Sequence, residues 1–154
     1  RSAAGAAARR GACCDRPTVA VSQRHPLELL LDTHALLWWV AEPDRLSPAA
    51  LQAIADPGNR VHVSAASGWE IATKVRLGKL PAASELLHDL PELLAAQGFE
   101  PLPITLVHGL HAGRYPMAHR DPFDRLLAAQ SELGGLTLVS LDPALQAFPC
   151  CLLW

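Results

Sequence analysis

The sequence lacks the long apolar segments of membrane proteins and the strong positive charge of proteins that coat nucleic acids. Its longest apolar stretch, residues 29–40, is too short to cross a membrane and is interrupted by Asp32 and His34. The formal net charge of -2 is close to zero, which excludes a general nucleic-acid-coating protein, because such chains are strongly basic. We therefore expect no membrane association, and any contact with nucleic acid must be local.

The four cysteines do not form the pattern of a zinc site. They occur as two adjacent pairs, Cys13-Cys14 and Cys150-Cys151, and the C-x-x-C spacing is absent. Neighbouring cysteines rarely bond to each other. We interpret all four as unpaired thiols and expect a cytoplasmic protein.

Half of the residues are hydrophobic, which is enough to build the core of one domain. The beginning of the chain differs from the rest, because its first 25 residues contain five arginines and one aspartate and show no apolar periodicity. We predict that residues 1–26 are a disordered or extraneous extension and that residues 27–154 form a single domain.

Short apolar stretches alternate with helical patterns through this domain. Strands are expected at residues 27–31, 60–63, 99–104, 136–140 and 150–154, and helices at 34–41, 48–55, 67–78, 84–97, 105–115 and 121–134. Pro91 is expected to break or kink its helix, and the proline-containing third strand to lie near a sheet edge. The alternation predicts an α/β fold, a three-layer α/β/α sandwich with a mostly parallel central sheet.

Four acidic residues stand where such a fold would gather them. Asp32 and Asp142 follow the first and fourth strands, and Glu70 and Asp124 lie in the first turns of two helices. Strand carboxyl ends and helix N-termini meet at one edge of a parallel sheet. Crowded carboxylates repel one another unless a divalent ion neutralises them, and Mg²⁺, with Mn²⁺ as a substitute, prefers such ligands. The sequence therefore predicts metal-dependent hydrolysis of a phosphodiester bond.

Each of these acids also has a purely structural explanation. A lone aspartate after a strand is often a turn residue. Glu70 can complete a capping box begun by Ser67, or it can pair with Lys74 one turn later. Asp124 is favoured by the helix dipole, and Asp121 is best explained as an N-cap. The coincidence of four acids at one sheet edge is what favours a shared site.

Four segments carry a resemblance to a known family. The strings LLLDTHALLWW, SAASGWEIATKVRLGKL, HRDPFDRLLAAQ and LTLVSLDPAL have the order and spacing found in PIN-domain nucleases of the VapC toxin type, and the similarity runs from Leu29 to Trp154. This resemblance implies an α/β/α sandwich and a metal-dependent endoribonuclease that is the toxin of a toxin–antitoxin pair. It places the family's catalytic and metal-binding acids on Asp32, Glu70, Asp124 and Asp142, with Asp121 of second rank.

The same resemblance implies the partners. They are an RNA substrate, a small cognate antitoxin and a second copy of the chain in a homodimer. We expect Lys74, Arg76 and Arg120 to contact RNA, because basic side chains position a phosphate backbone. The sequence departs from the family at Ser140-Leu141-Asp142, where Thr-Arg-Asp is frequent, so the hydroxyl is kept and the arginine is lost.

Two other functions share part of this pattern. The first is a catalytically inactive PIN-like module that only binds partners, and the retention of four mutually repelling acids argues against it. The second is a phosphatase of the haloacid-dehalogenase type, which also uses an aspartate after its first strand. That chemistry needs a D-x-D motif, and His34 stands at the second position.

Overall fold

A five-stranded parallel sheet forms the centre of the protein, whose computed structural model describes residues 25–154. The predicted extension, residues 1–26, lies almost entirely outside the described part, so that prediction stays untested. The strands follow the order β3-β2-β1-β4-β5, and every neighbouring pair is parallel. Their bounds are β1 (Glu28–Leu31), β2 (Arg60–Ser64), β3 (Glu100–Leu102), β4 (Thr137–Val139) and β5 (Cys151–Leu153).

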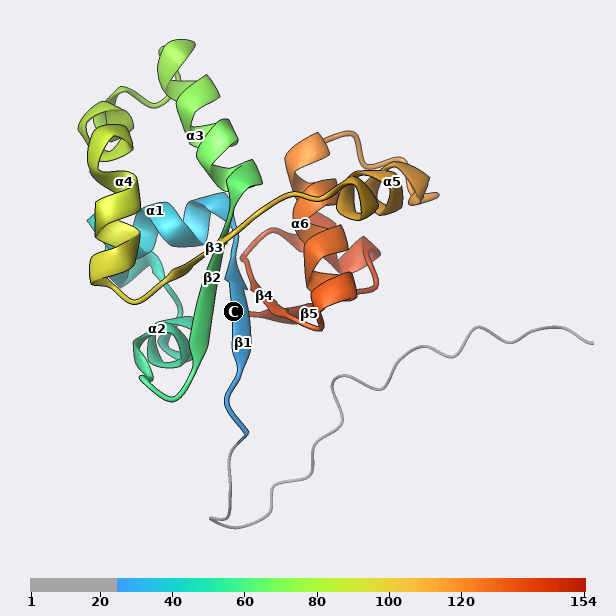
Figure 1. Cartoon of the computed structure of the whole chain (residues 1–154), viewed down its shortest axis with the longest axis horizontal. Coiled ribbons are helices and arrows are strands. Elements are labelled where there is room, and N and C mark those ends of the chain that lie inside the picture. Colours follow the sequence, from blue (N-terminus) through green and yellow to red (C-terminus); the bar gives the residue numbers. More distant parts are fainter. Residues whose placement is uncertain (1–24) are drawn as a thin grey trace, which may run out of the picture.

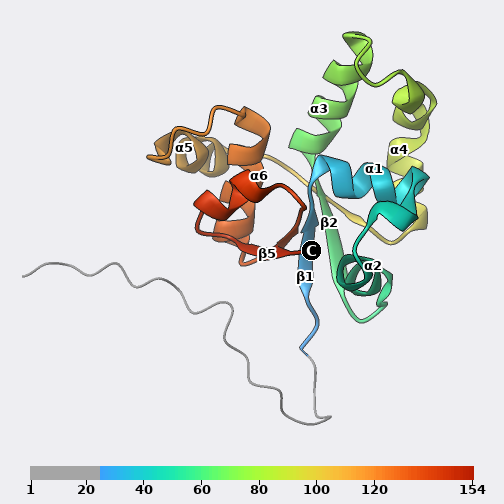
Figure 2. The same ribbon diagram turned by 180° about the vertical axis from the view of Figure 1, so that it is seen from behind.

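Helices cover both faces of this sheet. Figures 1 and 2 show α1 to α4 on one side and α5 and α6 on the other, which confirms the three-layer α/β/α sandwich. The α-helices are α1 (Thr33–Ala41), α2 (Pro48–Ala55), α3 (Ala65–Arg76), α4 (Ser84–Ala96), α5 (Leu106–Arg114) and α6 (Pro122–Gly134). Three short 3₁₀ helices lie between these elements: η1 (Pro43–Arg45) between α1 and α2, η2 (Pro81–Ala83) between α3 and α4, and η3 (Pro143–Ala147) between β4 and β5.

The central strand β1 is apolar throughout its second half because it is buried on both faces. Leu29 and Leu31 pack in the core beneath α1 to α4, and Leu30 packs on the opposite face against Leu127 and Leu138. All three leucines of β1 are fully buried. Each contributes about 2 kcal/mol of hydrophobic free energy, so this strand fixes the position of the residue that follows it, Asp32.

The start of α3 differs from the sequence prediction. Its N-cap is Ser64, whose hydroxyl accepts a hydrogen bond from the N–H of Ala66 at 2.9 Å, whereas Ser67 is buried within the helix. The predicted capping box between Ser67 and Glu70 is therefore wrong, and Glu70 lies in the second turn. The reason is that β2 passes directly into α3, so the helix begins before the serine that the local pattern favoured.

The two proline predictions had different outcomes. Pro91 does not break its helix, because α4 is continuous around it, and the alternative of a kink stays a prediction. Pro101 lies in β3, at one edge of the sheet, as predicted. An edge strand accepts proline because the missing N–H can be the one that faces away from the neighbouring strand.

The two cysteines near the C-terminus differ in state. Cys150 carries a free thiol, whereas Cys151 is disulfide-bonded. The expectation of unpaired thiols is thus confirmed for the first and wrong for the second, because adjacency disfavours only a bond between the neighbours themselves. Among residues 25–154, no helix combines the length and the apolar character needed to cross a membrane.

Candidate active site

A small pocket of about 80 Å³ at the carboxyl end of β1 gathers the acids predicted from the sequence. They come from the end of β1, from α3, from the start of α6 and from the loop after β4. The pocket is lined by Asp32, Thr33, His34, Glu70, Lys74, Asp121, Asp124 and Asp142. The predicted convergence of four acids is therefore observed, while their catalytic role stays a prediction.

Asp32 is almost completely buried and is held by two donors. Its Oδ1 accepts a hydrogen bond from the N–H of Ala35 at 2.6 Å, and its Oδ2 accepts one from the hydroxyl of Ser140. Burial raises the pKa of this carboxyl above its ordinary value, although both hydrogen bonds act in the opposite direction. The Ser140 hydroxyl also accepts a hydrogen bond from the N–H of Asp142 at 3.1 Å. One serine thus ties the first acid to the backbone of the fourth.

Glu70 is also buried, and both of its oxygens have partners. The hydroxyl of Thr33, the residue directly after Asp32, donates to Oε2, and Nζ of Lys74 lies 2.6 Å from Oε1. The lysine is the i+4 partner of the glutamate on α3, and it is more exposed than the carboxylate it meets. Thr33 therefore orients Glu70, and Lys74 brings one positive charge to the pocket.

Asp124 is the acid on which the crowding of negative charge is clearest. Its Oδ2 lies 2.7 Å from Nε2 of His119. Burial raises the pKa of its carboxyl to about 6, the like charges of Asp121 and Asp142 act in the same direction, and the hydrogen bond with His119 opposes them. A pKa this high means that the charged form of Asp124 is disfavoured in the folded protein, so a cation in the pocket would stabilise that charged form.

Asp121 and Asp142 are exposed and serve as N-caps. Oδ1 of Asp121 accepts a hydrogen bond from the N–H of Phe123 at 2.8 Å, and Oδ1 of Asp142 accepts one from the N–H of Ala144 at 2.8 Å. The N-cap explanation of Asp121 is thus confirmed. Each aspartate uses one carboxylate oxygen as a cap, so the structural and functional explanations do not exclude each other.

The chemistry of this donor set fits a hard divalent cation. Carboxylate oxygens are the protein ligands that Mg²⁺ and Mn²⁺ prefer. The set is open rather than closed: among residues 25–154, no three His, Cys, Asp or Glu side chains already stand as a ready group of metal ligands. Which of these carboxylates would contact an ion directly therefore stays a prediction.

Sequence reasoning missed the role of Arg125, on the first turns of α6. Its guanidinium donates hydrogen bonds to four backbone carbonyls, those of Ala112, Tyr115, Met117 and His119, at 2.7 to 3.2 Å. These bonds fix the segment before α6 and so keep His119 in contact with Asp124. No local pattern predicts them, because a carbonyl is present at every residue and gives no sequence signature.

The three basic residues predicted to contact RNA differ in position. Lys74 lines the acidic pocket. Arg76, in the last turn of α3, and Arg120, directly before Asp121, are exposed and are not among the lining residues. The pocket thus distinguishes Lys74 from the two arginines, and RNA binding by all three stays a prediction.

Comparison with known proteins gives consistent matches. The model of the PIN domain family matches residues 29–149. Ribonuclease VapC22 of Mycobacterium tuberculosis (strain ATCC 25618 / H37Rv) is 35% identical over 120 residues, which cover 77% of this chain and 90% of that protein. Ribonuclease VapC16 of the same strain is 38% identical over 58 residues, 38% of this chain and 41% of that protein.

Two solved structures share the fold. VapBC2 from Rickettsia felis, bound to a DNA fragment from its promoter, matches with a TM-score of 0.62 and 14% identity over 83% of this chain and 99% of that one. FitAcB from Neisseria gonorrhoeae matches with a TM-score of 0.55 and 21% identity over 82% of this chain and 96% of that one. At these identities the likeness concerns the fold alone.

Proposed function

Because the chain belongs to the PIN domain family, we propose that it is a divalent-metal-dependent endoribonuclease and the toxin of a toxin–antitoxin pair. The observation that carries this proposal is the acidic pocket, in which acids from four separate elements meet at the positions that the family pattern assigns. The similarity to VapC22, which is described as a ribonuclease, supports RNA as the substrate.

The acids of the pocket would hold the ion, which is Mg²⁺ with Mn²⁺ as a substitute. A bound ion supplies the charge that polarises a phosphoryl oxygen and lowers the pKa of a bound water. The ligands are Asp32, Glu70, Asp124 and Asp142, with Asp121 in a supporting role. Ser140 and Thr33 keep the two buried carboxylates in place, since their hydroxyls donate directly to them.

Substrate contacts of this chain are local. The whole protein is nearly neutral, so binding of RNA depends on the few cations close to the pocket. Lys74 is the first of these, because its ammonium lies at the pocket wall and can exchange its carboxylate partner for a phosphate. Arg76 and Arg120 are exposed and do not line the pocket, so they would contact other phosphates of the strand.

The partners follow from the same proposal. A toxin of this family requires a small antitoxin that keeps it inactive, and we propose such a partner for this chain, which shares its fold with VapBC2 and FitAcB. We further propose a homodimer, and action in the cytoplasm, where RNA is accessible. An inactive PIN-like binding module is the second candidate, and it predicts partner binding without cleavage.

The test is incubation of the purified full chain with total RNA in Mg²⁺, in Mn²⁺ and in EDTA, followed by mapping of the new RNA ends. Cleavage at discrete positions in either metal, and none in EDTA, is the expected result. Intact RNA under all three conditions would contradict the nuclease proposal and favour the inactive module. Cleavage that persists in EDTA would contradict the role of the metal while leaving a ribonuclease.

A further inference from the structure

One aromatic side chain close to the acidic pocket is left uncovered by the fold. Trp69, in the second turn of α3, is 57% exposed, and it is the only exposed Phe, Tyr or Trp in the part of the chain that the structure describes. The other tryptophans are partly buried: Trp38 packs against Trp154, and Trp39 packs against Phe99. Tryptophan normally gains stability by burying its large apolar surface, so this exception needs a physical explanation.

The position of Trp69 relates it to the acidic pocket. It directly precedes Glu70, and its ring meets the ring of Phe123 at a centroid distance of 4.9 Å and an interplanar angle of 65°. Phe123 in turn directly precedes Asp124, the pocket acid on α6. The aromatic pair therefore joins α3 to α6, the two helices that contribute Glu70 and Asp124 to the pocket.

The geometry of the pair leaves apolar ring surface free. Two rings at a steep angle meet edge to face, and such a contact orients a ring without covering both of its faces. Phe123 is partly buried and so anchors the pair, whereas Trp69 keeps more than half of its surface in solvent. A flat aromatic face of this kind, held from one side, is the type of surface on which an unpaired nucleobase stacks.

We propose that Trp69, supported by Phe123, is a stacking platform for an unpaired nucleobase of the RNA whose backbone lies at the acidic pocket. This inference rests on the proposed function. Stacking tolerates every base, because each base presents a π face. The platform therefore selects single-stranded RNA over paired RNA, and it acts separately from the phosphate contact assigned to Lys74.

The test compares two fluorescein-labelled probes: a ten-nucleotide oligoadenylate and a ribose-phosphate chain of the same length without bases. Binding to the uncleaving Asp32→Asn protein is followed by fluorescence anisotropy at one fixed salt concentration. We expect the oligoadenylate to bind roughly 10-fold more tightly than the chain without bases. In that background, Trp69→Leu should abolish the difference, and Trp69→Phe should retain part of it. Leu77→Ala is the matched control, because Leu77 is a 51% exposed apolar residue at the other end of α3.

A second test measures cleavage kinetics in protein that keeps Asp32, so it does not depend on RNA binding by the Asp32→Asn variant. In otherwise wild-type protein, Trp69→Leu should raise KM for cleavage of a single-stranded RNA that contains one of the mapped cleavage positions by roughly 10-fold, and should change kcat much less. An unchanged KM, with base-dependent binding intact, overturns the platform. A change confined to the molar mass measured by light scattering also overturns it, because that result assigns the ring to a contact between two copies of the chain.

Failure of this inference can be told from failure of the proposed function. Wild-type protein that cleaves RNA in Mg²⁺ while Trp69→Leu matches it in every readout disproves the platform alone. Wild-type protein that neither cleaves nor binds RNA disproves the ribonuclease proposal and the platform with it.

Discussion

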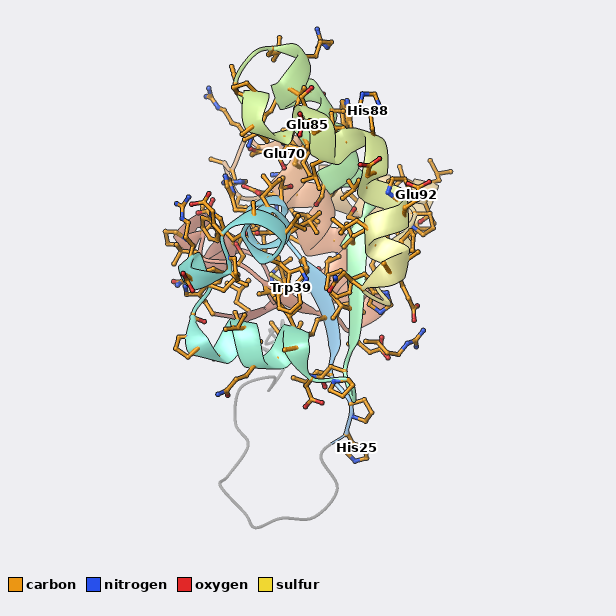
Figure 3. All side chains as sticks on the ribbon, turned by 90° about the vertical axis from the view of Figure 1, so that its left-hand side faces the viewer. His25, Trp39, Glu70, Glu85, His88 and Glu92 are labelled. Atoms are coloured by element: carbon orange, nitrogen blue, oxygen red, sulfur yellow. The ribbon has the colours of Figure 1, made fainter. Side chains whose placement is uncertain are left out.

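Two of the pockets formed by residues 25–154 differ in size and in chemistry, and they lie at opposite ends of the central strands. The acidic pocket at the carboxyl end of β1 measures about 80 Å³, while the second measures about 420 Å³ and is lined mostly by apolar residues. The lining of the second pocket is Trp39, Ile54, Ala55, Asp56, Pro57, Asn59, Val61, Gln97, Gly98 and Phe99. Figure 3 shows Trp39 next to the strands and well apart from Glu70. The larger of the two pockets is therefore not the one that holds the proposed active site.

The polar groups of the two pockets have different roles: those of the apolar pocket form hydrogen bonds within a turn, and those of the acidic pocket are clustered carboxylates. In the apolar pocket, Asp56 accepts a hydrogen bond from the N–H of Gly58, and the Asn59 side chain donates to the carbonyl of Ala53 and accepts from the N–H of Leu27. These contacts build a turn and involve one acid. In the acidic pocket several carboxylates lie together, and burial raises the pKa of two of them, which is a mark of functional sites. The comparison predicts that mutations will separate activity from stability.

The largest effect should come from Asp32→Asn. The change keeps the shape of the side chain but removes one negative ligand from the acidic pocket, so cleavage of RNA should fall on the order of 1000-fold. Stability should not fall, because burial already disfavours the charged form of Asp32. Cleavage at saturating Mn²⁺ and the melting temperature in EDTA measure the two quantities.

The control for this variant is Asp56→Asn, in the apolar pocket. Asn can still accept the turn hydrogen bond from Gly58, so both activity and stability should stay close to the wild type. An Asp32→Asn protein that cuts RNA as fast as the Asp56→Asn protein would erase the distinction between the pockets, and the metal site would lose its support.

The second effect is a loss of stability without a loss of cleavage, and it is expected for a mutation in the apolar pocket. Phe99 is buried and packs against Trp39 with 5.9 Å between ring centroids. Phe99→Ala should lower the free energy of unfolding by about 3 kcal/mol, through lost burial and a new cavity. Urea denaturation measures that loss, and cleavage at low temperature per folded molecule should be unchanged. Normal stability with reduced cleavage would show that the apolar pocket takes part in the reaction.

The third effect concerns the hydroxyl that joins the first and fourth acids. Ser140→Ala removes the donor to Asp32 and the acceptor for the N–H of Asp142, so cleavage should fall by about 10- to 100-fold. Ser140→Thr keeps the hydroxyl and should restore most of the rate. If alanine and threonine variants behave alike in kcat and in metal dependence, Ser140 only fills space.

The smallest effect is a dependence of stability on pH in the absence of metal. The pKa of Asp124 in the folded protein is about 6, above the ordinary value of an aspartate carboxyl, so the folded state binds this proton more readily than the unfolded state. The destabilisation is therefore complete above about pH 6 and is relieved as the pH falls from about 6 towards 4. In EDTA the melting temperature should rise by about 2–4 °C between about pH 7.5 and about pH 5.5.

The Asp124→Asn variant isolates this contribution, because it removes the titrating group. Its melting temperature in EDTA should change less over the same pH interval than that of the wild type. Equal slopes for the two proteins would show that another group is responsible. Added Mg²⁺ should also flatten the wild-type dependence, if the ion keeps the carboxylate ionised.

The sequence was sufficient for the features that depend on local pattern. The apolar run before Asp32 and the alternation of strands with helices predicted the parallel sheet, and the sheet brought the acids to one edge. The proline in β3 indicated an edge strand for a physical reason that the fold confirms. The N-cap of α3 was misplaced, because Ser64 and Ser67 are locally equivalent and only the path of β2 decides between them.

Contacts between residues far apart in sequence could not be predicted. Thr33 meets Glu70 across 37 residues, and Ser140 meets Asp32 across 108. Nothing in the flanking residues marks a hydroxyl as the donor to a distant carboxylate, although the serine in place of the family's threonine was a hint. The uncovered ring of Trp69 was equally invisible, because a tryptophan in a helix is normally assumed to pack inside.

The two edge strands of the sheet limit strand pairing between this protein and other chains. β3 and β5 are each three residues long, and β3 contains Pro101, which offers no N–H to a docking strand. Short edges interrupted by proline are poor templates for added strands, and natural proteins use them to resist aggregation. The β3 edge is therefore a poor template because of its proline, and the β5 edge because it is only three residues long. Any partner must instead recognise side chains, which makes recognition of this fold a matter of surface chemistry rather than of strand pairing.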